Sequence, residues 1–220
     1  MSYFRRKCRE NGESASAKII ETAEALIGSH GVDGVSLRQI SLAAGQRNNY
    51  AVQYHFGDLV GLMDAIRMQR TPVVETARVE MLAAVKQAGR QGDTRAIVDV
   101  LFLPLLNFRN ANGDRSFARF VLAVHSTPDS TRNGQIFGAM PAAEEAFRLL
   151  HAANPGIPFA LLLERMRLIS IMVLLSVFNR RAPYDGVEWD APLIDNALDM
   201  ASAALVAAIS PPVVKLMDAG

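Results

Sequence analysis

The chain has 220 residues, of which 50% are hydrophobic and 20% are charged, a composition typical of globular proteins and unlike that of disordered chains. The formal net charge of +1 excludes the strong overall basicity of many nucleic-acid binders. Charged residues interrupt the longest apolar stretch, residues 159–178, which is therefore too short for the roughly 20 apolar residues of a membrane span. The single cysteine, Cys8, excludes an internal disulfide and every CxxC metal or redox site.

The first ten residues contain four cations and only one carboxylate, and no apolar segment follows them. A secretory signal has such a segment, so we expect a cytoplasmic protein. We expect residues 1–13 to form a basic flexible arm. Two interpretations of this segment stay open: an arm that reaches DNA phosphates or the minor groove, and a solvated terminus.

Strand-like alternation of apolar and polar residues is absent, and helix-favouring residues fill the periodic segments. The sequence therefore predicts an all-α protein. All ten prolines lie at or beyond Pro72, which indicates that the N-terminal part differs in organisation from the rest. We expect one helical domain over residues 14–58 and a larger helical domain over residues 59–220.

The first predicted helix runs from Ser14 or Ser16 to Ser29, with apolar residues recurring on one face, and glycines follow its end. Ser36 and Gln39 have the spacing of a capping box, which predicts a second, short helix that ends at Gly45.

A third helix is expected from Arg47 or Asn48 to Phe56. Gly57-Asp58 then supplies a stop and a new N-cap for a helix that begins at Leu59.

Two short helices joined by a glycine-containing turn and preceded by a longer helix are typical of the helix-turn-helix motif. The residues Ile40-Ser41-Leu42-Ala43-Ala44-Gly45, with Tyr54-His55-Phe56 ending eleven positions after the glycine, resemble the DNA-binding signature of TetR-family regulators. The resemblance covers residues 14–66. The segment from Gln46 to Val52 is one residue longer than is common, as in a subgroup with a Gln-Arg-Asn-Asn turn, and Leu59 replaces the family's usual lysine.

The resemblance and the chemistry of the side chains together predict the DNA contacts. Ala43 and Ala44 are expected where the short helices cross, and Gly45 is expected to have a positive φ. Amide side chains suit adenine, and arginine suits guanine. The phosphate contacts are expected at the groove flanks, from Ser36, Arg38, Tyr54 and His55. For Tyr54 a core position is the alternative, and for the polar residues a solvated face. The predicted DNA-binding residues are Ser36, Arg38, Gln46, Arg47, Asn48, Asn49, Tyr50, Gln53, Tyr54 and His55.

Glycines and prolines divide the remaining chain into further predicted helices. Thr71-Pro72 is expected to break or restart the helix that begins at Leu59. Pro104 is expected to bend its helix and to open space beside it. The expected helical ranges are 59–70, 73–88, 94–110, 114–126, 131–152, 158–181 and 189–209.

The predicted helix 158–181 is apolar on nearly every face, and the predicted helix 189–209 has one broad apolar face with small alanines. The family resemblance implies that both form a four-helix dimer interface with a second subunit. A core pair within one chain is the alternative. The predicted interface residues are Leu168, Met172, Leu175, Leu198, Ala201 and Leu205.

Aromatic and methionine side chains lie between these regions, where they would ordinarily be core. The resemblance implies a cavity for a small apolar effector among them. The predicted effector-binding residues are Phe102, Asn107, Phe108, Arg119, Phe120, His125, Phe137, Met140 and Met166.

The resemblance thus implies a homodimeric, ligand-responsive repressor that binds a pseudo-palindromic operator in double-stranded DNA. No nucleotide-binding, nucleophile-elbow or zinc-protease motif occurs, and the four histidines lack ligand-like spacing. We therefore expect no enzyme activity, no metal, no cofactor and no membrane partner. The alternative function is a helical ligand-binding or enzymatic protein whose N-terminal bundle docks a protein partner.

Overall fold

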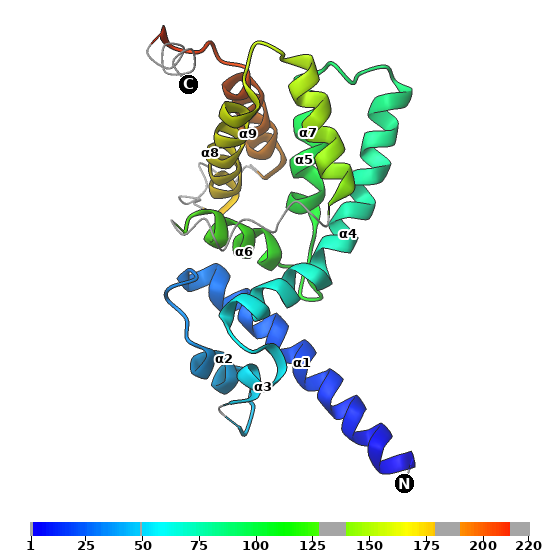
Figure 1. Ribbon diagram of the computed structural model, residues 1–220, viewed down its shortest axis with the longest axis vertical. Helices are drawn as coiled ribbons and strands as arrows, with labels where there is room; N and C mark the ends of the chain where they lie inside the picture. The colour runs from blue at the N-terminus through cyan, green and yellow to red at the C-terminus, as the bar shows by residue number, and fades with distance from the viewer. Residues whose placement is uncertain (1, 49, 128–139, 179–189, 212–220) are drawn as a thin grey trace. The chain divides into compact units, whose positions relative to one another are not determined.

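The computed structural model describes residues 2–48, 50–127, 140–178 and 190–211, and all regular elements in these ranges are helices (Figure 1). The protein is therefore all-α, as the sequence predicted. None of the described helices is long and apolar enough to cross a membrane. In chain order the helices are α1 (Ser2–His30), α2 (Leu37–Ala43), α3 (Ala51–Phe56), α4 (Leu59–Gln87), α5 (Thr94–Asn107), α6 (Ser116–His125), α7 (Pro141–Ala153), α8 (Phe159–Phe178) and α9 (Asp190–Leu205).

Most helices match the predicted ranges to within a few residues, but α1 does not. It begins at Ser2, so residues 2–13, predicted as a flexible arm, lie within a helix. Arginine, lysine and glutamate in this segment favour helix, and no proline interrupts it. The N-terminal part of the predicted helix 131–152 falls on residues 128–139, which lie outside the described residues.

The helix α4 continues through Pro72, where the sequence predicted a break. Proline removes one backbone donor, which leaves the carbonyl of Met68 without its helical partner. Pro72 and Met68 are both exposed, so water can reach this turn of the helix. The loss of the hydrogen bond is therefore tolerated without an end to the helix.

The chain forms two compact units, and their limits differ from the predicted boundary at residues 58 and 59. Unit 1 comprises residues 1–76 and 105–140, and unit 2 comprises residues 77–104 and 141–220. The predicted domain 59–220 is therefore divided, because α6 packs along α1 inside unit 1.

Gly28 explains how closely α1 and α6 approach each other. A Cβ atom at Gly28 would lie only 2.9 Å from Cβ of Arg119 and 3.2 Å from the backbone nitrogen of Phe120. Any larger side chain would therefore push the two helices apart. Phe117, Phe120 and Val124 bury the apolar side of α6 within this unit.

The rest of the unit 1 core comes from the apolar face that the sequence predicted for α1. Ile19, Ala23 and Ile27 are fully buried, and α1 contacts both α2 and α3. Full burial of a side chain such as Ile27 stabilises the fold by about 1.5–3 kcal/mol. The first turns of α4 add further buried side chains, namely Leu62, Met63 and Ile66.

In unit 2, α8 and α9 lie along each other (Figure 1). Arg165 of α8 donates to the backbone oxygen of Leu205 at 2.7 Å and so satisfies a carbonyl at the end of α9. Lys86 of α4 pairs with Glu145 of α7 at 2.5 Å. The buried side chains include Leu162, Ile169, Val173 and Leu174 of α8 and Ile194, Leu198, Ala201 and Leu205 of α9.

Candidate nucleic-acid interface

The start of α2 is fixed by a capping box between Ser36 and Gln39. The backbone nitrogen of Ser36 donates to Oε1 of Gln39 at 2.8 Å, and that of Gln39 donates to Oγ of Ser36 at 3.3 Å. The structure confirms the predicted capping box. Ser36 and Arg38 are both exposed at this end of α2, so their side chains are accessible to a phosphate.

The turn after α2 is set by backbone geometry at Gly45. Its φ is 69°, which confirms the predicted positive value. The backbone nitrogen of Gly45 donates to the oxygen of Leu42, and that of Gln46 donates to the oxygen of Ser41, both at 3.0 Å. This pair of bonds is a Schellman motif, and it directs the chain toward α3.

The two alanines before this glycine have different environments. Ala44 is buried, as expected for a residue at the crossing of α2 and α3. Ala43 is exposed, so the prediction that both alanines lie at the crossing is wrong for Ala43. A helix presents adjacent residues about 100° apart, so Ala43 and Ala44 point in different directions.

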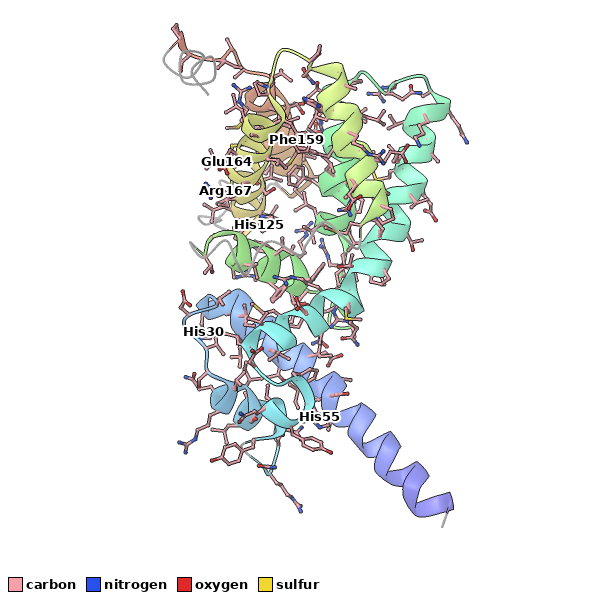
Figure 2. The ribbon with its side chains drawn as sticks, in the orientation of Figure 1. His30, His55, His125, Phe159, Glu164 and Arg167 are labelled. Carbon is pink, nitrogen blue, oxygen red and sulfur yellow. The ribbon has the colours of Figure 1, made fainter. Side chains whose placement is uncertain are left out.

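The third helix, α3, begins with buried residues and continues with exposed ones. Ala51 and Val52 are buried, whereas Gln53, Tyr54 and His55 are exposed. Tyr54 is 84% exposed, which excludes its alternative interpretation as a core aromatic. The rings of Tyr54 and His55 meet edge to face at 5.2 Å (His55 is labelled in Figure 2). The exposed residues of α3 therefore have hydrogen-bonding side chains suited to a groove or its phosphates.

Two of the amides predicted to bind DNA are engaged within the turn. Oδ1 of Asn48 accepts from the backbone nitrogen of Tyr50 at 2.9 Å, and Nε2 of Gln46 donates to the oxygen of Ala44 at 3.3 Å. Asn48 therefore fixes the approach to α3, and α3 begins at Ala51 rather than at Arg47 or Asn48. Asn49 lies outside the described residues.

Arg47, Tyr50 and Gln53 remain exposed near the start of α3. Gln53 is thus the exposed amide that the described part of α3 offers to a base edge. After α3, Gly57 has a φ of 77°, and Oδ1 of Asp58 accepts from the backbone nitrogen of Gly61 at 2.8 Å. The positive φ of Gly57 confirms the predicted stop, and the hydrogen bond to Asp58 confirms the predicted new N-cap.

The predicted dimer residues divide into exposed and buried groups. On α8, Leu168 is 58% exposed, Leu175 is also exposed, and Met172 is half-buried. On α9, the predicted Leu198, Ala201 and Leu205 are all buried, with Ala201 at 0% exposure.

The interface prediction must be corrected for these three residues of α9. Their side chains are covered inside one chain, where α9 packs on α8. Leu193, which the sequence placed on the apolar face of this helix, and Met200, which was not predicted, are both exposed on α9. They lie seven residues apart, and this spacing places them on one face of a helix.

The predicted effector-binding residues do not form one described site. Phe102 and Met166 lie buried in unit 2, and Phe137 lies outside the described residues. The effector-binding role stays a prediction. The remaining candidates belong to unit 1: Asn107 and Arg119 are exposed, Phe120 is buried, and Phe108, His125 (labelled in Figure 2) and Met140 are half-buried.

Three aromatic rings of unit 1 form a chain of contacts. Phe108 meets Phe117 edge to face, and Phe117 stacks on Phe120, with 6.0 Å between ring centroids in each pair. Phe117 was not among the predicted residues, although its spacing of three residues from Phe120 indicates a shared helix face. Among the described residues, no group of three or more His, Cys, Asp or Glu is placed to hold a metal ion.

Comparison with known proteins gives a solved structure but no family assignment. No protein-family model and no curated protein match the chain. A solved structure from Mesorhizobium loti MAFF303099, provisionally described as a TetR-family transcriptional regulator, is similar over 89% of this chain and 96% of its own. The two are 18% identical, with a TM-score of 0.42.

Proposed function

We propose that this protein is a TetR-like transcriptional regulator that binds double-stranded DNA through α2 and α3. The observation that carries the proposal is that α3 begins with buried residues and continues with exposed, hydrogen-bonding ones. Ala51 and Val52 are buried in the unit 1 core, whereas Gln53, Tyr54 and His55 are exposed beside them. In a helix-turn-helix motif the second helix lies in the major groove with its exposed side against the bases.

The exposed side chains fall into two chemical roles. Gln53 can bond both N6 and N7 of adenine in the major groove, and Arg47 can bond both O6 and N7 of guanine. Arg38, Tyr54 and His55 are assigned to phosphates, which fix the register of the protein without reading sequence. Asn48 is reassigned from base contact to support of the turn, because its carbonyl oxygen already accepts from Tyr50.

The proposal includes a homodimer and a pseudo-palindromic operator. Leu168 and Leu175 on α8, with Leu193 and Met200 on α9, are large apolar side chains that remain exposed in one chain. A second copy that covers them would place two recognition helices on one DNA.

The proposal also includes a repressor role, with release from DNA by a small apolar effector. The rings of Phe108, Phe117 and Phe120 are the candidate contacts of this effector.

Selection of bound duplexes from random DNA, with the full chain, tests this function. We expect enrichment of a site with two inverted half-sites. Gln53→Ala should relax the preference at one position per half-site, and Arg38→Ala should weaken all sequences alike. Arg148→Ala is the matched control, because Arg148 is an exposed arginine on α7, and it should leave binding unchanged.

Failure to enrich any sequence would reject the regulator. The alternative, a helical protein that docks a protein partner through its N-terminal bundle, would then account for the exposed Leu42, Tyr50 and Tyr54. Enrichment of single asymmetric half-sites would keep DNA binding but reject the dimer. Dimerisation is measured separately, by sedimentation of the protein without DNA.

A further inference from the structure

A buried carboxylate joins three helices of unit 1. Glu24 of α1 is 1% exposed, and its Oε2 accepts from Nε of Arg70 in α4 at 2.6 Å. Its Oε1 accepts from the hydroxyl of Ser116, the first residue of α6. Both carboxylate oxygens therefore have a donor, and the donors come from two different helices.

The loop before α6 holds Ser116 in place. Nδ2 of Asn110 donates to Oγ of Ser116 at 3.1 Å. Oδ1 of Asn110 accepts from the backbone nitrogens of Asn112 and Asp114, at 3.0 and 2.8 Å. Asn110 thus shapes the loop and orients the hydroxyl that reaches Glu24.

Arg70 has a second contact, with an aromatic ring. Its guanidinium carbon lies 6.0 Å from the centroid of Phe108, at the limit of a cation–π interaction. Phe108 begins the chain of rings that continues through Phe117 to Phe120. Arg70 therefore has two contacts. One is with the carboxylate of Glu24 in α1, and the other is with Phe108, the first ring of the aromatic cluster that continues into α6.

The carboxylate depends on Arg70. A buried charge that loses its partner is strongly unfavourable, so a change that draws Arg70 away forces Glu24 to move or to gain water. Glu24 is followed on the same helix by Ile27, which is fully buried in the core that supports α2 and α3. A movement of Glu24 is therefore transmitted to the helices that face DNA.

We propose that Arg70 is a positioning residue for DNA binding: it holds Glu24 and thereby α1, and the ring of Phe108 regulates this contact. The inference rests on the proposed function. It assigns a regulatory role to a junction whose members all lie within unit 1. A carboxylate on the apolar side of α1 was the sequence signal for it.

The first test removes both charges together, because replacement of a buried pair by apolar residues of similar volume is often tolerated. The Glu24→Met, Arg70→Met double variant of the full chain should keep its thermal midpoint within a few degrees, but bind the selected DNA about tenfold more weakly. Arg90→Met is the control, because Arg90 forms an exposed pair with Asp93, and it should leave affinity unchanged. A folded double variant with wild-type affinity would overturn the proposal.

Ser116→Ala is the second variant, used if the double variant does not fold. It removes one hydrogen bond to Glu24 and leaves the ion pair intact. We expect a folded protein with several-fold weaker DNA binding, and rescue by Ser116→Thr, which restores the hydroxyl. Equal affinity for the alanine and threonine variants would overturn the proposal.

The role of Phe108 is tested by a double-mutant cycle. Phe108→Leu should weaken DNA binding in the wild-type background and have no effect in the Glu24→Met, Arg70→Met background, where the regulated contact is absent. The same loss in both backgrounds would remove Phe108 from the mechanism.

Amide hydrogen exchange supplies a readout that does not need DNA. The charge-free variant should exchange faster than wild type in residues 51–56, which form α3, because α1 no longer holds α3 in one position. Unchanged exchange in these residues would overturn the inference. If the wild-type protein binds no DNA, the proposed function fails, and this exchange experiment still decides whether the junction positions α3.

Discussion

Arg78 of α4 donates through Nε to the backbone oxygen of Val100 in α5, at 3.3 Å. Its Nη2 donates to the next carbonyl, that of Leu101, at 3.0 Å. Pro104 has no backbone N–H and cannot bond the carbonyl four residues before it, which is that of Val100. Arg78 is only 5% exposed and supplies the missing donor. Where the sequence predicted open space beside Pro104, a guanidinium group meets the freed carbonyl.

Removal of this guanidinium should destabilise the protein. Arg78→Met keeps much of the side-chain volume but leaves the Val100 carbonyl buried without a donor. We expect the free energy of unfolding to fall by about 1–3 kcal/mol, measured by urea denaturation.

Pro104→Ala provides the matched background for this measurement. Alanine restores a backbone N–H, which can bond Val100 directly. The effect of Arg78→Met should therefore be clearly smaller in the Pro104→Ala protein than in wild type. An equal loss in both backgrounds would show that Arg78 does not act through the proline-freed carbonyl.

Asn48→Ala should weaken DNA binding without a change in base preference. The substitution removes the oxygen that bonds the amide of Tyr50, so the start of α3 loses a support worth about 1 kcal/mol. Asn48→Ser restores an acceptor and should recover most of the affinity. Affinities for the selected site and its single-base variants distinguish the outcomes, because a preference changed at one position would return Asn48 to base reading.

Substitutions at the α8–α9 pair should separate folding from assembly. Ala201→Glu places a carboxylate at a fully buried position and should lower the free energy of unfolding by several kcal/mol. Leu168→Glu and Met200→Glu change exposed positions, so helix content by circular dichroism should be unchanged while sedimentation shows a monomer. A folded Ala201→Glu protein would contradict the observed burial, and dimers of both exposed variants would place the interface elsewhere.

The start of α5 should make stability depend on acid. The hydrogen bond from Arg90, followed by that from the amide of Ala96, holds the pKa of the Asp93 carboxyl below its ordinary value of 3.8. The stabilisation is present above this value and is lost as the pH falls through the lowered pKa of the folded state. Because the pair is partly exposed, we expect less than about 1 kcal/mol.

Urea midpoints measured between about pH 6 and pH 3 test this expectation. Asp93→Asn should reduce the loss of stability on acidification relative to wild type. Parallel pH profiles for the two proteins would show that Asp93 does not contribute.

The sequence by itself determined the local features of the DNA-binding unit. The capping box at Ser36, the positive φ of Gly45 and the N-cap at Asp58 each involve residues no more than a few positions apart. Such features depend on backbone geometry and on short hydrogen bonds that neighbouring residues can form alone. Helical periodicity in the same way predicted the apolar face of α1 and its burial.

Only the tertiary structure decided which residues lie together across the chain. The hydrogen bond between Ser116 and Glu24 spans 92 positions, and no local pattern pairs them. Periodicity also marked the apolar face of α9 without showing what covers it, so Ala201 was predicted to face a partner although it is buried within its own chain. The reason is physical: an apolar face requires burial but does not specify the surface that buries it.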